Sequence, residues 1–168
     1  SDSEQVQEFN HSYYQGLLLY IGNMKKLETY VPAQDKNRRC INVKLGEIST
    51  LPEVPPFSYQ EFVNRSSTID VMWFQPNSLG SEVMMPDSFF EVEHSTDIQN
   101  SLCKFADLQS FNAQMFIVAD ARRHDEFIAK LSHDYFKPIS DRVKFVSYDK
   151  LDRYYEGLMM QRKSSLIL

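Results

Sequence analysis

Residues 89–94 read Phe89-Phe90-Glu91-Val92-Glu93-His94, and two carboxylates interrupt this otherwise apolar stretch. Side chains of a β-strand point alternately to its two faces, so Glu91 and Glu93 are expected to share one face. An earlier apolar stretch at residues 69–74 contains a third carboxylate, Asp70. We therefore predict two strands that bring three acidic side chains together.

A cluster of this kind needs a compensating cation. A buried carboxylate without a partner is costly, and neighbouring carboxylates raise one another's pKa. The simplest cation is a hard divalent metal bound through oxygen atoms, with Mg²⁺ as the usual ion and Mn²⁺ as its substitute. Such a metal lowers the pKa of a bound water and stabilises charge on a phosphoryl oxygen, which favours a phosphodiester as substrate. The alternative is that these acids are solvated at strand ends or paired with Arg or Lys.

Length and composition are those of one globular domain. The chain has 168 residues and a hydrophobic fraction of 42%, and no apolar run approaches the roughly 20 residues that span a bilayer. It shows no secretory signal, and Cys40 and Cys103 are too far apart to suggest a disulfide framework or a zinc site, so we expect unpaired thiols in a reducing cytoplasm. The start Ser1-Asp2-Ser3 lacks an initiator Met, which suggests a piece of a longer protein.

The charge and the missing motifs exclude several function classes. A net charge of −5 and a pI near 5.4 argue against a protein that only coats nucleic acid, but they allow a nuclease with a local basic patch. The sequence contains no P-loop, no dinucleotide-binding glycine motif, no esterase nucleophile elbow and no H-E-x-x-H zinc motif.

Hydrophobic periodicity predicts helices and strands in alternation. Capping boxes at residues 58–61 and 96–99 mark the starts of two helices. We expect helices over residues 3–30, from residue 58, over 98–111, over 124–131 and over 148–161. We expect strands over residues 40–45, 69–74, 89–94, 115–119 and 143–147. This order predicts the α/β class, with a central mixed β-sheet flanked by helices.

The spacing Asp70-(x20)-Glu91-x-Glu93, on two successive strands followed by a helix, resembles the signature of PD-(D/E)XK (restriction-endonuclease-like) nucleases. The element order over about residues 10–120 is similar to that family's αβββαβ core. Residues 121–168 would then be a C-terminal α/β extension of the same domain. Residues 90–96 also resemble uncharacterised prokaryotic members. The resemblance implies a metal-dependent endonuclease that hydrolyses DNA and uses Mg²⁺.

Carried over by position, the resemblance implies that Asp70, Glu91 and the backbone carbonyl of Val92 bind the metal. Glu93 occupies the family's usual lysine position, which is a departure. Some members carry Glu there, where it binds metal or orients the attacking water. Other members place the lysine on the neighbouring helix, which points to Lys104, and the alternative for Lys104 is a solvated helix lysine.

Substrate contacts are expected from the first helix and from basic loops. The resemblance suggests that His11 and Gln15 border the substrate groove, as first-helix residues do in this family. Lys36, Arg38 and Arg39 form a basic cluster that can bind phosphate, although a solvated loop is the alternative.

Four further features receive a structural interpretation. Arg122 and Arg123 form a second basic pair with the same alternative of a solvated loop. We expect His94 to be a satisfied core histidine and Trp73 to lie in the core. The last helix carries an apolar stripe that consists of Leu151, Tyr154, Tyr155 and Leu158. We expect this stripe to be core or a dimer surface rather than a platform for stacking bases.

Two other functions stay open beside the nuclease. An inactive nuclease fold that binds nucleic acid or a protein would fit the acidic pI and the glutamate at position 93. A phosphohydrolase acting on small molecules is disfavoured because no glycine-rich phosphate loop is present. For the nuclease the expected partner is DNA, and cutting both strands usually requires two active sites, which makes a homodimer plausible.

Overall fold

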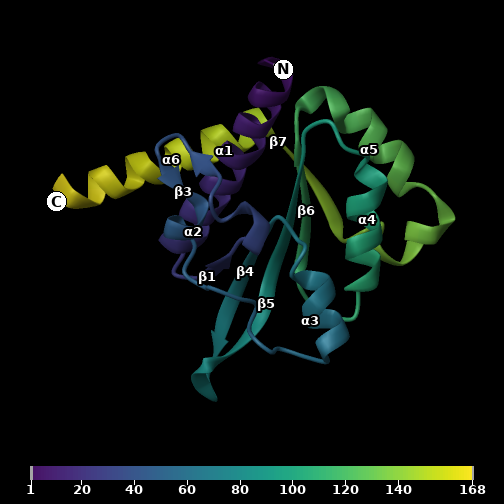
Figure 1. Cartoon of the computed structure of the whole chain (residues 1–168), viewed down its shortest axis with the longest axis horizontal. Helices are drawn as coiled ribbons and strands as arrows, with labels where there is room; N and C mark the ends of the chain where they lie inside the picture. The colour runs from purple at the N-terminus through teal and green to yellow at the C-terminus, as the bar shows by residue number, and fades with distance from the viewer. Residues whose placement is uncertain (1, 168) are drawn as a thin grey trace.

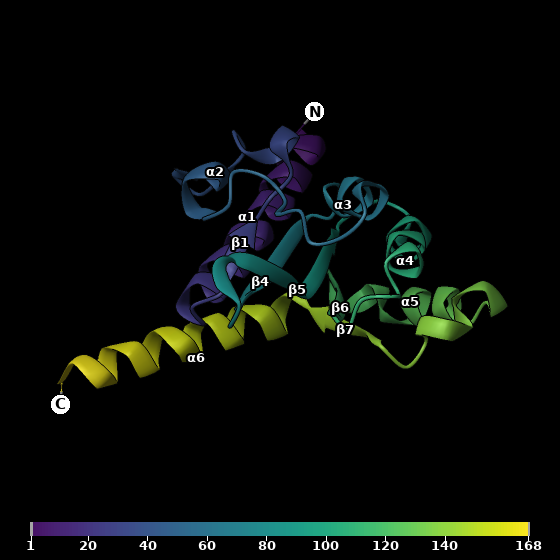
Figure 2. The same cartoon turned by 90° about the horizontal axis from the view of Figure 1, so that it is seen from below.

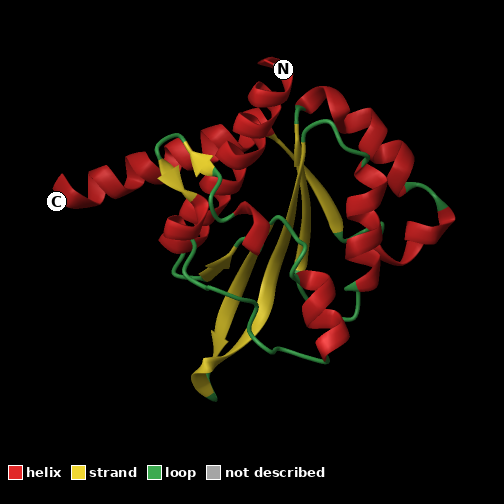
Figure 3. Ribbon diagram, in the orientation of Figure 1, coloured by secondary structure: helices red, strands yellow, loops and turns green. Residues whose placement is uncertain are grey.

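The computed structural model describes residues 2–167 and has mixed α/β architecture, as the sequence predicts (Figure 1). A five-stranded sheet with the order β1-β4-β5-β6-β7 forms the centre, and helices cover both of its faces (Figure 3). The strands are β1 (Glu28–Tyr30), β2 (Arg39–Cys40), β3 (Val43–Lys44), β4 (Val71–Asn77), β5 (Gly80–Glu93), β6 (Gln114–Ala119) and β7 (Val143–Ser147). The helices are α1 (Asp2–Met24), α2 (Leu45–Ile48), α3 (Gln60–Ser66), α4 (Ile98–Asp107), α5 (His124–Leu131) and α6 (Tyr148–Ile167), with 3₁₀ turns at Ala33–Asp35, Ala121–Arg123 and Asp134–Ile139.

Strand direction changes at the middle of the sheet. The pairs β1–β4 and β4–β5 are antiparallel, whereas the pairs β5–β6 and β6–β7 are parallel. Parallel neighbours need a crossover connection, and α4 joins β5 to β6 while α5 and the 3₁₀ turn Asp134–Ile139 join β6 to β7. The acidic stretch of β5 therefore lies between an antiparallel and a parallel neighbour and leads directly into α4.

Helices lie on both faces of the sheet (Figure 2), and each face has its own hydrophobic core. One core packs α4 and α5 against the sheet through residues such as Phe89, Phe105 and Phe136. The other packs α1, α2 and α6 against it through residues such as Leu18 and Phe90. Adjacent residues of β5 thus enter different cores. Across the described residues no helix is both long and apolar enough to cross a membrane.

The first helix ends earlier than its periodicity predicts. It stops at Met24, and Lys26 adopts a left-handed conformation with φ 63° that a continuing helix cannot contain. The next residues, Glu28–Tyr30, form β1 and pair with β4. The prediction of one helix up to residue 30 is therefore wrong, because pairing with a strand far along the chain overrides local helical periodicity.

The strand predicted over residues 40–45 is also wrong. These residues are divided between the two-stranded hairpin of β2 and β3 and the start of α2, and the hairpin lies outside the central sheet. Residues 76–86, between the predicted strands over 69–74 and 89–94, extend both strands and form the hairpin that joins β4 to β5. The first strand of the central sheet is therefore β1, which the sequence pattern did not reveal.

The predicted capping boxes do not form, although both helices exist. Tyr59 precedes α3 without a side-chain cap. Asp97 caps α4 by accepting a hydrogen bond from the amide of Gln99, while the Thr96 hydroxyl bonds to Glu93 instead. The helix over residues 124–131 and the strand over 143–147 are confirmed. Both cysteines are free, as expected.

Candidate active site

Asp70 and Glu91 lie side by side where β4 begins and β5 approaches its end. The antiparallel register pairs Val71 with Phe90, so the preceding residue, Asp70, falls beside Glu91. The backbone N–H of Asp70 donates to Glu91 Oε2 at 2.9 Å, and the backbone N–H of Val92 donates to Asp70 Oδ2 at 2.8 Å. Two predicted ligands are thus held together by the backbones of two strands.

Glu91 and Glu93 point to the same face, as the strand period predicts. Both carboxylates reach the hydroxyl of Ser101 on α4, which lies 3.2 Å from Glu91 Oε1 and also bonds to Glu93. The Thr96 hydroxyl bonds to the other oxygen of Glu93. Both glutamates are buried, with 2% and 5% of their surface exposed. The hydroxyls therefore hold Glu93 in the wall of the site.

Lys104 faces the acids rather than solvent. Its Nζ lies 2.8 Å from Glu91 Oε1 and donates to the backbone carbonyl of Thr68 at 2.9 Å. Only 22% of its side chain is exposed. The solvated alternative for Lys104 is therefore wrong, and the structure brings a lysine from α4 into contact with Glu91.

His11 and Gln15 of α1 support Asp70 from behind. His11 Nε2 lies 3.4 Å from Asp70 Oδ2, and its Nδ1 lies 3.0 Å from Gln15 Oε1. The amide of Gln15 donates to Asp35 Oδ2 at 3.1 Å and to the backbone carbonyl of Asp70 at 3.0 Å. Gln15 has 0% exposed surface. It therefore cannot contact a substrate directly, contrary to the prediction that it borders the substrate groove. It positions Asp70 and His11 instead.

Burial and mutual repulsion separate the pKa values of the acids. Burial, followed by the charge of Asp70, raises the pKa of Glu91 well above its ordinary value, and Lys104 opposes this rise. Burial also acts to raise the pKa of Asp70, but contact with His11 and the amide of Val92 outweigh it, so that pKa is lowered. Burial raises the pKa of Glu93 against the hydrogen bonds from Ser101 and Thr96. Two acids with opposite pKa shifts thus lie side by side, and a cation beside them, such as Lys104, stabilises the charge that they carry.

The acids line a cleft of about 520 Å³ between the first half of α1 and α4. Of the predicted basic cluster, only Arg38 lines this cleft. Lys36 donates to the backbone carbonyl of Pro52, and Arg39 donates to the carbonyl of Asn42 at 3.0 Å. Lys36 and Arg39 are therefore directed to other loops, and phosphate binding by the basic cluster stays a prediction.

The loop after β5 is fixed by Arg123. Its guanidinium donates to the carbonyl of His94 at 3.2 Å and to that of Thr96 at 2.7 Å. Arg122 is 77% exposed and remains solvated. His94 also lines the cleft, and its buried Nδ1 has no hydrogen-bond partner within the described part of the chain. It is therefore not the satisfied core histidine that the sequence suggested.

Sequence reasoning missed Ser101, and a signal for it exists. The residues at positions 98, 101, 102 and 105 follow helical spacing and form the buried stripe of α4. A serine within an otherwise apolar stripe needs a polar partner, and the two glutamates provide it. The same reasoning would have predicted that α4 packs over Glu91 and Glu93.

The donor set fits a hard divalent cation with few protein ligands. Within residues 2–167 no three His, Cys, Asp or Glu side chains form a complete metal site. The centre offers the carboxylates of Asp70 and Glu91, and the carbonyl of Val92 is the further oxygen that the sequence suggested. Mg²⁺ commonly keeps several waters and takes one or two carboxylates plus substrate phosphate, so this incomplete set is suited to it.

Comparison with known proteins gives one informative match. The sequence matches the model of a protein family described as the Type II restriction enzyme NmeDI C-terminal domain, and the match covers residues 2–166. No curated protein and no solved structure matches the chain. The family match spans every element of the fold and every residue of the acidic cleft.

Proposed function

Since this chain belongs to the family of the Type II restriction enzyme NmeDI C-terminal domain, we propose that it is a Mg²⁺-dependent endonuclease that hydrolyses phosphodiester bonds of DNA. The observation that carries the proposal is the contact of Lys104 with the interlocked pair Asp70 and Glu91, with 2.8 Å between Lys104 Nζ and Glu91 Oε1. Carboxylates that can hold a divalent metal, with a cation beside them, are groups that metal-assisted hydrolysis of a phosphodiester can use.

We further propose that the site is a variant of the PD-(D/E)XK arrangement. Glu93 occupies the usual lysine position on the strand, but Lys104 of α4 brings its ammonium beside Glu91. The hydroxyls of Ser101 and Thr96 occupy the oxygens of Glu93. These contacts support a site in which α4 supplies the lysine in place of the strand, with Glu93 as a positioning residue.

Each residue then has a role that follows from its contacts. Asp70, Glu91 and the carbonyl of Val92 would hold Mg²⁺, which when bound lowers the pKa of water and stabilises phosphoryl charge. Lys104 orients the attacking water and stabilises the negative charge that builds on the phosphate as the bond to the 3′ oxygen breaks. Arg38, which lines the cleft, binds a neighbouring phosphate. Gln15 and His11 keep Asp70 in place.

The alternative of an inactive module that only binds a partner rested on the acidic pI and the glutamate at position 93. Lys104 weakens that alternative because it supplies from α4 a lysine beside Glu91, which position 93 of the strand lacks. The two functions differ in one property. An inactive module would bind DNA without turnover, with or without divalent cations.

Cleavage of supercoiled plasmid tests the proposal. The wild-type chain is expected to nick or linearise plasmid in Mg²⁺ or Mn²⁺ and to lose this activity with a chelator. Glu91→Gln removes a ligand charge and should lower the rate by roughly a thousandfold. Glu61→Gln, on the exposed surface of α3, is the matched control and should cleave normally.

A binding measurement separates loss of chemistry from loss of fold. Isothermal calorimetry with Mn²⁺ should show binding to the wild type and to Glu61→Gln but not to a folded Glu91→Gln variant, with circular dichroism as the check on folding. A folded Glu91→Gln variant that cleaves at the wild-type rate would refute the proposed centre.

A further inference from the structure

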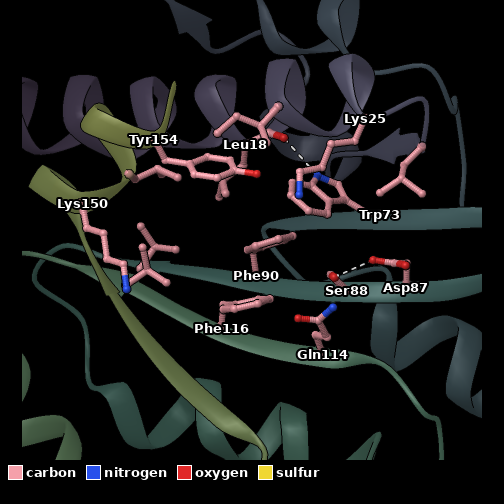
Figure 4. Close-up of a pocket in the computed structure, with 15 residues that line it drawn as sticks. Leu18, Lys25, Trp73, Asp87, Ser88, Phe90, Gln114, Phe116, Lys150 and Tyr154 are labelled. Atoms are coloured by element: carbon pink, nitrogen blue, oxygen red, sulfur yellow. Dashed lines mark hydrogen bonds between the residues drawn. The ribbon is translucent and has the colours of Figure 1, made fainter. Parts of the chain in front are cut away.

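A second cavity lies on the opposite face of the sheet from the acidic cleft, where β4, β5 and β6 pack against α1 and α6 (Figure 4). Its volume is about 460 Å³, and ligand pockets typically measure roughly 300–1,000 Å³. None of the proposed catalytic residues lines it. Apolar side chains dominate its wall and a few polar groups converge on it, which is the usual composition of a site for an organic ligand.

Aromatic rings lie on two sides of this cavity. Phe90 and Phe116 stack on the sheet with ring centroids 5.0 Å apart and planes 10° apart. Trp73 adjoins Phe90 with a centroid distance of 4.4 Å. Tyr154 of α6 lies across the cavity from the two phenylalanines, and it is 44% exposed (Figure 4). Aromatic faces on both sides of a gap favour a flat ring over a flexible chain.

Two lysines give the cavity a positive rim. The ammonium of Lys25 lies 5.8 Å from the ring centroid of Trp73 and 5.4 Å from that of Tyr154. Lys150 lines the other end of the cavity (Figure 4). Within the part of the chain that the structure describes, neither ammonium has a carboxylate in salt-bridge range. Their charges are therefore available to an anion.

Polar groups at one end of the cavity can recognise the edge of a ring. The hydroxyl of Ser88 donates to Asp87 Oδ1 at 2.8 Å, and Ser88 is 1% exposed. Gln114 lines the cavity beside them, as Figure 4 shows, and its side-chain amide forms no hydrogen bond with the described residues. The amide offers both a donor and an acceptor, and Asp87 offers a further acceptor. This combination matches the donors and acceptors on the edge of a nucleobase.

We propose that this cavity binds a nucleotide, with its base between Tyr154 and the Phe90–Phe116 pair and its phosphate on Lys150. The nucleotide can be free in solution or can be an unpaired nucleotide of a nucleic acid. The proposal does not depend on catalysis at the acidic cleft, because the two sites share no residue. If the nucleotide proposal fails, the nuclease proposal is unaffected, and the reverse also holds.

The chain contains one tryptophan, and it lines the cavity, so Trp73 fluorescence reports occupancy directly. Titration with adenosine monophosphate should quench this fluorescence to saturation, and adenosine should bind more weakly because it lacks the phosphate. Tyr154→Ala and Lys150→Ala should each weaken binding by roughly tenfold. The controls Tyr135→Ala and Lys137→Ala alter exposed residues outside the cavity and should bind normally.

The source of the nucleotide is distinguished by a second titration. A short DNA duplex with one unpaired 2-aminopurine is compared with the fully paired duplex. Saturation by adenosine monophosphate supports a free nucleotide, and quenching only by the duplex with the unpaired base supports a nucleotide within nucleic acid. The proposal is overturned if neither probe quenches Trp73, or if Tyr154→Ala and Lys150→Ala bind as the wild type does.

Discussion

The two faces of β5 carry opposite chemistry in adjacent residues. Glu91 and Glu93 face α4 and each has named polar partners, whereas Phe90 faces α1 and α6 and packs among aromatic rings. The strand period of two residues separates the faces completely. The difference teaches that carboxylates persist in a buried sheet only on the face where a lysine and hydroxyls meet them.

Transferring a carboxylate to the aromatic face gives the largest expected effect. Phe90→Glu buries a charge among aromatic rings, at a position 4% exposed, and should lower the free energy of unfolding by about 4 kcal/mol. Chemical denaturation measures the loss. Phe9→Glu makes the same change at a position 52% exposed and should leave stability nearly unaltered. Equal effects would show that burial on the aromatic face does not make a carboxylate costly.

Replacing Lys104 tests whether the acidic face depends on its cation. Lys104→Met keeps much of the side-chain volume but leaves Glu91 without its partner, and plasmid cleavage should fall by roughly a hundredfold. Lys104→Arg should recover part of that loss because it restores the charge. Lys137→Met, on an exposed turn, is the control. Full activity of Lys104→Met would mean that this lysine is structural.

A buried support of the acidic face should have a smaller effect. Gln15→Leu removes the hydrogen bonds to Asp35 and to the carbonyl of Asp70, and cleavage should fall by roughly tenfold, as it does when groups behind metal ligands are lost. The Mn²⁺ affinity measured by calorimetry should fall with it. Gln5→Leu changes an exposed residue of the same helix. If both variants cleave alike, Gln15 does not position the site.

The smallest expected effect lies on the aromatic face. Trp73→Phe removes the hydrogen bond from the indole to the carbonyl of Leu18 at 3.0 Å and should cost about 1 kcal/mol of stability. Thermal unfolding measures this change, while plasmid cleavage should be unaltered. A large loss of cleavage would mean that the two faces are coupled.

Elements whose own residue pattern is clear over their full length could be predicted from the sequence. The helix His124–Leu131 and the strand Val143–Ser147 occupy the predicted residues. By contrast β1 is a three-residue strand, Glu28–Tyr30, next to a strongly helical segment. It becomes a strand only because β4 lies beside it, and no local pattern specifies that partner.

The residues of the candidate site also differ in how well the sequence predicts their place. Alternation along β5 was sufficient to place Glu91 and Glu93 on one face. The contact of Lys104 with Glu91 depends on how α4 packs, and the burial of Gln15 depends on how α1 packs. A sequence pattern predicts which face of its own helix or strand a side chain occupies. It does not predict which residues of other elements will contact that side chain.

The hydrogen bond from Gln15 to the carbonyl of Asp70 joins residues 55 positions apart, and so does the bond from the Tyr148 hydroxyl to the carbonyl of Glu93. Contacts between such distant residues form late in folding, because closing long loops costs entropy before any contact is gained. The acidic cleft is therefore complete only after helices from both ends of the chain have docked. A partly folded chain lacks the assembled centre, so competence for chemistry should emerge last, together with the final closure of the fold.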